Sequence, residues 1–157
     1  MKISIRKGVS FGLTSSMITT LGLIIGLNAG THLKGVVIAG ILTIAIADAF
    51  SDALGIHISE ESGRKKSSRL VWESTIATFF SKFFFALTFL VPVLLFELDT
   101  AIIVSIIWGL LLIGILSFYT ARIQKTSATK AIFEHILITI LVIILTNYVG
   151  NWISGLF

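Results

Sequence analysis

The chain has 157 residues, of which 55% are hydrophobic and only 13% are charged. Soluble domains contain about 45–50% apolar and about 25% charged residues, so this composition excludes an ordinary soluble domain and indicates an integral membrane protein. Cysteine is absent, which excludes disulfides and thiolate metal sites. The net charge of +4 does not indicate a nucleic-acid partner, because the basic residues stand at the ends of apolar segments, where membrane topology requires them.

Five apolar segments follow one another, and each approaches the roughly 20 residues that a helix needs to cross a bilayer. The predicted spans are residues 11–29, 35–56, 70–95, 101–120 and 132–153. We therefore expect a single all-α transmembrane domain over residues 1–157, in contact with the lipid bilayer. A basic start before an apolar run is also typical of a signal peptide, but the first run is long for one and further spans follow.

The basic residues predict the orientation of these spans. All but two of the 12 lie on one side of the membrane, in the N-terminal segment and in the loops after the second and fourth spans. They are Lys2, Arg6, Lys7, Arg64, Lys65, Lys66, Arg69, Arg122, Lys125 and Lys130. Because basic residues favour the cytoplasmic side, we expect the N-terminus in the cytoplasm and the C-terminus outside. The small, cysteine-free chain favours a prokaryotic plasma membrane over an organelle membrane.

Two carboxylates interrupt the second span. Asp48 and Asp52 stand four residues apart, so they share one face of a helix with Ser51. An ionised carboxylate at the centre of a bilayer costs roughly 2.5–3.5 kcal/mol, and such residues generally face a protein interior or a water-filled path. The predicted topology places both in the cytoplasmic half. It also places Lys82 of the third span, roughly 15 Å above Trp72, near the level of Asp48.

These groups predict one polar site between the first three helices, open to the cytoplasm. The first span contributes hydroxyls in the same half, including Ser15 and Thr19, although such hydroxyls also bond back to the carbonyl four residues earlier. Two carboxylates with hydroxyls supply the hard oxygen ligands of a divalent metal ion, and carboxylates also relay protons. In that case Asp48 and Asp52 handle the ion, and Lys82 is released when it arrives. A structural ion pair between Asp48 and Lys82, with Asp52 reaching interfacial water, is an equal alternative.

Other polar residues border this predicted site. His57 lies one turn past Asp52, and Glu73 lies one turn into the third span, where it is a candidate entry group for ions. Both residues also fit the polar edge of a membrane without any role in transport. Glu60 and Glu61, beside the basic loop, are predicted to form a solvated face.

Small residues form a stripe on the first span. Gly22, Gly26 and Gly30 recur every four residues, which gives a flat face where another helix backbone can approach closely. Two partners fit this glycine stripe. One is another helix of the same chain, and the other is the first helix of a second copy, in a homodimer.

No catalytic pattern accompanies these features. The sequence contains no metalloprotease-type pair of histidines around a Glu, no phosphate-cradling glycine loop and no nucleophile elbow, so neither an enzyme nor a permanently bound cofactor is predicted. The remaining function classes are a transporter and a non-transporting membrane scaffold or complex subunit with a structural Asp48–Lys82 pair. A carrier of an anion that binds near Lys82 is a third, weaker option.

Several stretches together resemble the vacuolar iron transporter family, whose members move iron and manganese across membranes. The stretch Thr19–Gly30, TTLGLIIGLNAG, is similar to the family's first-helix pattern of paired Thr followed by Gly-Leu-x-x-Gly. The stretch Ile38–Ser59 resembles the family's second helix, and Pro92 resembles the proline that ends its third. The final TNYVGNWI, residues 146–153, resembles its last Tyr-x-x-Gly segment.

The resemblance covers nearly the whole chain and implies a fold and a function. It implies five spans with the N-terminus inside and the C-terminus outside, in a homodimer whose ion path is lined by the first helix. It further implies proton-coupled export of Fe²⁺ or Mn²⁺ from the cytosol, with the metal ion as a transported substrate.

The chain departs from the family at its ion-binding positions. Ser15 stands where the family has a first-helix Asp, Asp52 where it has a Met ligand, and Ile56 where it has a Glu. The metal-binding helices that plant-type members carry between the second and third spans are missing, and Lys82 has no counterpart. The resemblance therefore makes Asp52 a metal position with a changed ligand. Asp48 is the candidate that compensates for the acid missing at Ser15.

Overall fold

The computed structural model describes residues 2–63 and 67–156, and this part of the chain is almost entirely helical. Its helices are α1 (Ile3–Thr31), α2 (Lys34–Glu61), α3 (Ser68–Thr88), α4 (Leu90–Leu95), α5 (Leu98–Gln124) and α6 (Ala128–Ser154). Arg64, Lys65 and Lys66, which contribute to the predicted orientation, lie outside the described residues.

Five helical segments of the described chain are long and apolar enough to cross a bilayer: α1, α2, α3 together with α4, α5, and α6. This confirms the predicted number of apolar helices and indicates a multi-pass membrane protein. Each predicted span falls within one of these segments, and the helices exceed the spans at nearly every end. The reason is that hydropathy identifies only the apolar part of each helix, whereas the helical hydrogen bonds continue into the polar residues on either side.

The third span is not the single continuous helix that the sequence predicts. Helix α3 ends at Thr88 and α4 begins at Leu90, with Phe89 between them. Pro92 has no N–H to donate to the carbonyl of Thr88, four residues earlier, and its ring crowds that carbonyl. The chain makes a tighter turn there, in which the N–H of Phe89 donates to the carbonyl of Ala86 over 3.2 Å. The proline thus interrupts the span one turn before its own position.

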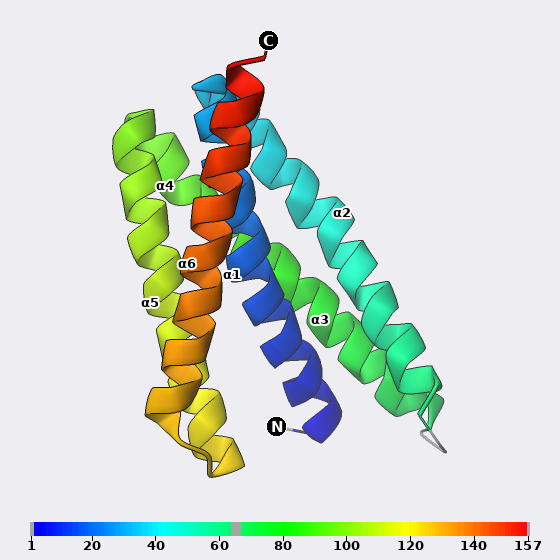
Figure 1. Ribbon diagram of the computed structural model, residues 1–157. Coiled ribbons are helices and arrows are strands. Elements are labelled where there is room, and N and C mark those ends of the chain that lie inside the picture. The colour runs from blue at the N-terminus through cyan, green and yellow to red at the C-terminus, as the bar shows by residue number, and fades with distance from the viewer. Residues whose placement is uncertain (1, 64–66, 157) are drawn as a thin grey trace.

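Helix α1 is the centre of the bundle, since it packs on α2, α3, α5 and α6. Figure 1 shows that α1 and α2 are close at one end of the bundle and diverge toward the end that holds the N-terminus. Helix α3 packs extensively on both of them. The two termini lie at opposite ends of the bundle, as an odd number of spans requires (Figure 1).

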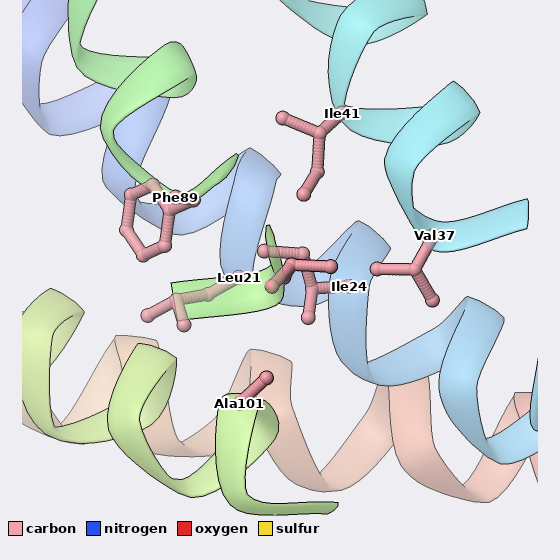
Figure 2. Close-up of a cluster of buried hydrophobic side chains, with 7 residues drawn as sticks. Leu21, Ile24, Val37, Ile41, Phe89 and Ala101 are labelled. Atoms are coloured by element: carbon pink, nitrogen blue, oxygen red, sulfur yellow. The ribbon is translucent and has the colours of Figure 1, made fainter. Parts of the chain in front are cut away.

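An apolar core fills the half of the bundle away from the N-terminus. Figure 2 shows its side chains pointing toward one another from α1, α2, the α3–α4 turn and α5. The fully buried members are Leu21, Ile24, Val37, Ile41, Phe89, Val93 and Ala101. The polar residues of the predicted ion site lie in the other half, on the stretches of α1, α2 and α3 nearer the N-terminal end.

The glycine stripe of α1 faces α6 of the same chain. Its members are Gly22, Gly26 and Gly30. Across the contact, a Cβ atom added to Gly150 of α6 would lie 2.8 Å from Cβ of Ala29 and 3.0 Å from the backbone N of Gly30. Only glycine leaves room for two backbones this close. The structure therefore contains the first of the two partners expected for the stripe, and the homodimer stays a prediction.

Candidate functional site

Lys82 is a fully buried cation in this half of the bundle. It lies in α3 with 1% of the residue exposed. Thr78, Lys82 and Ala86 recur every four residues and are all buried, so they form the face of α3 that packs into the bundle. A buried ammonium group is stable only when it is paired and hydrogen-bonded, and its partners therefore define the site.

Both predicted carboxylates of α2 reach this ammonium group. Nζ of Lys82 lies 2.5 Å from Oδ2 of Asp48, and it donates a hydrogen bond to Oδ2 of Asp52. The Asp48 contact is an ion pair without good hydrogen-bond alignment, so Asp52 is the better-oriented partner. The side chains of Asp48 and Asp52 are 26% and 19% exposed. The ammonium is thus enclosed, while the carboxylates keep access to their surroundings.

Helix α1 completes the site with hydroxyl groups. Nζ of Lys82 donates a 2.7 Å hydrogen bond to Oγ of Ser15. The adjacent Ser16 donates to the backbone carbonyl of Lys82 over 3.1 Å, which ties α1 to α3 at this level. An ammonium group has three N–H donors, and Lys82 has three oxygen neighbours. The polar site predicted between the first three helices is therefore present as a cluster of Ser15, Asp48, Asp52 and Lys82.

The cluster has more negative than positive charge. Two carboxylates surround one ammonium, so the formal charge is −1 when all three groups are ionised. An uncompensated charge in a low-dielectric interior is costly. One added proton or one external cation reduces that cost, and the cluster is chemically suited to bind either of them.

Two hydroxyl residues predicted for the ion path form no hydrogen bond with Asp48, Asp52 or Lys82. Thr19 donates its hydroxyl to the backbone carbonyl of Ser15 over 2.9 Å, the bond that helical threonines commonly make within their own helix. Ser51 is exposed on α2, and no hydrogen bond joins its side chain to another described residue.

His57 belongs to a separate contact between α2 and α3. Its Nδ1 lies 3.0 Å from Oγ1 of Thr75, and its ring packs edge-on against Trp72. Its Nε2 lies 3.4 Å from a carboxylate oxygen of Glu61. Both ring nitrogens of His57 therefore have partners other than the groups around Lys82.

Glu73 of α3 forms hydrogen bonds with residues at the start of α1. It accepts hydrogen bonds from Lys2 over 2.6 Å and from Ser4 over 2.8 Å. Arg69, on the preceding turn of α3, donates a third over 3.1 Å. Three donors thus surround this carboxylate, and its suggested role in ion entry stays a prediction.

The prediction of a solvated face at Glu60 and Glu61 is wrong for Glu60. This residue is only 3% exposed and forms an ion pair with Lys7. Helix α1 begins at Ile3, well before the predicted span, and this extension carries Lys7 to the end of α2. The side chain of Glu61 is 63% exposed, as predicted.

The sequence did not predict the second carboxylate contact of Lys82 or the bond from Ser16 to the backbone carbonyl of Lys82. The spacing of the two aspartates contains the missing signal. Residues four apart stand one helical turn apart, about 5.4 Å along the axis, which is close enough for one ammonium to lie between their carboxylates. The bond from Ser16 to a backbone carbonyl has no comparable signal, because it depends on the exact approach of α1 to α3.

The donor set of the cluster limits how a metal ion would bind. Among residues 2–63 and 67–156, no three His, Asp or Glu side chains gather as a metal-binding group. A divalent ion at this place would have the carboxylates of Asp48 and Asp52, with the hydroxyl of Ser15 as a further oxygen. Since Lys82 contacts all three, the ion would take the position of its ammonium group.

No protein-family model matches this sequence, and no curated protein matches it.

Proposed function

We propose that this protein is a transporter of the cell membrane that exports Fe²⁺ or Mn²⁺ from the cytosol in exchange for protons. The observation that carries the proposal is the excess of carboxylate at the buried cluster, where two aspartates share one lysine. Carboxylate and hydroxyl oxygens suit Mn²⁺ and other hard divalent ions. The resemblance of the helices to the iron and manganese transporters supports the choice of metal.

Lys82 acts in this mechanism as an internal cation that occupies the carboxylates when no metal ion is bound. A divalent ion between Asp48 and Asp52 neutralises both carboxylates by itself, so Lys82 loses its counter-ions. Because an unpaired buried charge is costly, entry of the metal ion is coupled to displacement of the positive charge of Lys82 from the carboxylates.

An exchange of two protons for one divalent ion moves no net charge across the membrane. A cycle of this kind is driven by the pH difference and not by the membrane potential.

Binding of Mn²⁺ to the detergent-solubilised protein tests the site itself. A ligand that binds only the native state raises the melting temperature, and a hundredfold excess over Kd adds about 2.7 kcal/mol of stability. We expect this effect in the parent and its loss in Asp52→Asn. The matched control is Asp99→Asn, an exposed carboxylate on α5 outside the site, which retains the effect. An equal Mn²⁺ effect in the parent and in Asp52→Asn overturns the assignment.

A non-transporting scaffold or complex subunit is the second candidate. Three oxygen atoms surround the ammonium group of Lys82, as expected for an ion pair with a purely structural role, and this favours the scaffold. An exchange of charges, Asp48→Lys with Lys82→Asp, distinguishes the two. The scaffold predicts that the exchanged protein folds and that neither form moves Mn²⁺. The transporter predicts Mn²⁺ flux in the parent and none after the exchange.

We further propose a homodimer in which the second copy contacts α1 beside α6. A groove of about 500 Å³ lies between these helices, and Gly26 and Gly30 are part-exposed in it. Single cysteines in this cysteine-free chain test the proposal. Val149→Cys, in the groove, is expected to form a disulfide-linked dimer on oxidation, whereas Ile103→Cys, exposed on α5, is not. Equal cross-linking at both positions contradicts this dimer.

A further inference from the structure

A cavity of about 310 Å³ lies between α1 and α5, at the end of the bundle that holds the N-terminus. Arg6, Lys7 and Ser10 line it on α1, and Thr120 and Gln124 line it on α5. No acidic residue is among the described residues of its wall. Its volume is at the lower end of the roughly 300–1,000 Å³ of small-molecule sites. The proposed transport makes no use of it.

Arg6 supplies an available positive charge at this cavity. The residue is half-buried, yet its guanidinium makes no hydrogen bond or ion pair with any residue in 2–63 or 67–156. Lys7 differs, because its ammonium is paired with Glu60. A guanidinium group presents its N–H donors in a planar fork that matches two oxygens of a phosphate group. The arginine therefore favours a phosphate as the ligand.

Two hydroxyl groups of the cavity wall are also available as donors. Hydroxyls nearby bond back to their own helices, as Thr14 does to the carbonyl of Ser10 over 2.9 Å and Ser117 does to that of Ile113 over 2.5 Å. In the described part of the chain, the hydroxyls of Ser10 and Thr120 make no such bond. Both residues are half-buried at the cavity, so their hydroxyls can donate to a ligand there.

The cavity stands at the predicted surface of the membrane. Ser10 immediately precedes the first predicted span, and Thr120 is the last residue of the fourth. Arg6 and Gln124 lie one turn further out, roughly 6 Å along each helix, which is the level of lipid headgroups. Ile123 adds an apolar surface to the same wall.

We propose that this cavity binds a phosphate group, either in the headgroup of an anionic phospholipid or as free phosphate. Arg6 donates to two phosphate oxygens, and the hydroxyls of Ser10 and Thr120 donate further hydrogen bonds to the same phosphate group. Basic pockets between membrane helices near the cytoplasmic surface are suited to anionic headgroups. The bound group connects α1 to α5 on a part of the molecule separate from the Lys82 cluster.

Thermal unfolding of the full-length protein in detergent tests the proposal, with phosphatidylglycerol or inorganic phosphate as the added probe. We expect a saturable rise in the melting temperature of the parent and an apparent Kd at least tenfold weaker in Arg6→Gln. Arg6→Lys keeps the charge without the fork, and recovers only part of the affinity. The matched control, Arg122→Gln, removes an exposed arginine of α5 outside the cavity and leaves Kd within twofold.

The two probes identify the source of the phosphate. A saturable effect of phosphatidylglycerol alone that depends on Arg6 assigns the cavity to a lipid headgroup, and the same effect with inorganic phosphate assigns it to the free ion. Equal losses in Arg6→Gln and Arg122→Gln overturn the proposal, because they show only general attraction to basic residues. The absence of any saturable effect with either probe overturns it as well.

Discussion

Lys82 shows how one side chain joins three helices. From α3 it contacts Ser15 of α1 and both Asp48 and Asp52 of α2. A buried ion pair adds little net stability over apolar packing, but removal of one partner leaves the other charge uncompensated. Loss of Lys82 is therefore expected to destabilise this half of the bundle by more than the ion pairs themselves contribute.

Replacement of Lys82 by methionine is expected to destabilise the folded protein by about 3–5 kcal/mol, the usual cost of breaking a buried ion pair. Unfolding in mixed micelles measures the change. Lys130→Met is the matched control, because its ammonium is exposed beside Glu134 and such pairs contribute about 0–1 kcal/mol. A second substitution, Asp52→Asn, is expected to recover part of the loss in Lys82→Met. Equal losses in the two lysine variants contradict the predicted role of Lys82.

Depth along the helices was enough to predict the pairing of Asp48 with Lys82, since both positions follow from counting residues from the membrane edge. The bond from Asp52 to the same lysine was not predicted, because it depends on the direction in which the lysine side chain extends. Burial of Glu60 was not predicted either. Its ion pair with Lys7 was not predicted, because Lys7 lies in a part of α1 that is too polar for hydropathy to mark as helix.

At the scale of the helix, the contact between α1 and α6 depends on small residues on both sides. Gly150 lies against Ala29 and Gly30, with no room for a Cβ atom. Between apolar helices in lipid, such close backbone approach replaces the hydrophobic effect as a source of packing energy. Helix α6 is otherwise widely exposed, and its other packing partner is α5, where His135 of α6 lies 2.7 Å from the hydroxyl of Ser117.

Gly150→Ala is expected to destabilise the protein by about 1–3 kcal/mol, the usual cost of forcing extra atoms into a packed contact. Gly114→Ala is the matched control, because nothing lies within 4 Å of a Cβ atom built at Gly114 of α5. There the alanine is expected to be neutral or to stabilise by up to about 1 kcal/mol, as a better helix former. Melting temperatures of the two variants check the prediction, and equal destabilisation by both contradicts it.

The sequence was sufficient to predict the five apolar helices, because each contains a long apolar run. It did not predict the break at Phe89, since a proline near the end of an apolar run is compatible with either a cap or a kink. The spacing of Gly22, Gly26 and Gly30 predicted a close helix contact without identifying the partner. Small residues permit approach from any helix, and only the structure places α6 there.

At the scale of the whole molecule, the bundle is divided along its length. The half away from the N-terminus is closed by the apolar cluster around Leu21 and Phe89, and the other half contains Lys82 and its carboxylates. In the predicted orientation the charged cluster is on the cytoplasmic side. That orientation is what export from the cytosol requires of a site that first receives its ion there.

Cysteine labelling tests this orientation directly in a chain without native cysteine. Thr126 lies in the connection between α5 and α6, and Glu97 lies in the connection between α4 and α5, at the other end of the bundle; both are exposed. In intact cells, a membrane-impermeant maleimide is expected to label Glu97→Cys but to label Thr126→Cys only after permeabilisation. The reverse pattern contradicts the orientation.

Metal and proton movement in proteoliposomes is the most direct test of the proposed exchange. With the membrane potential clamped, the parent is expected to move Mn²⁺ against an opposing flow of two protons per ion, at a rate that does not depend on the potential. Asp48→Asn with Asp52→Asn is expected to abolish both movements, and Asp99→Asn is expected to leave them unchanged. Mn²⁺ flux that persists at the parental rate without the two carboxylates, or no flux from a folded parent, contradicts the proposal.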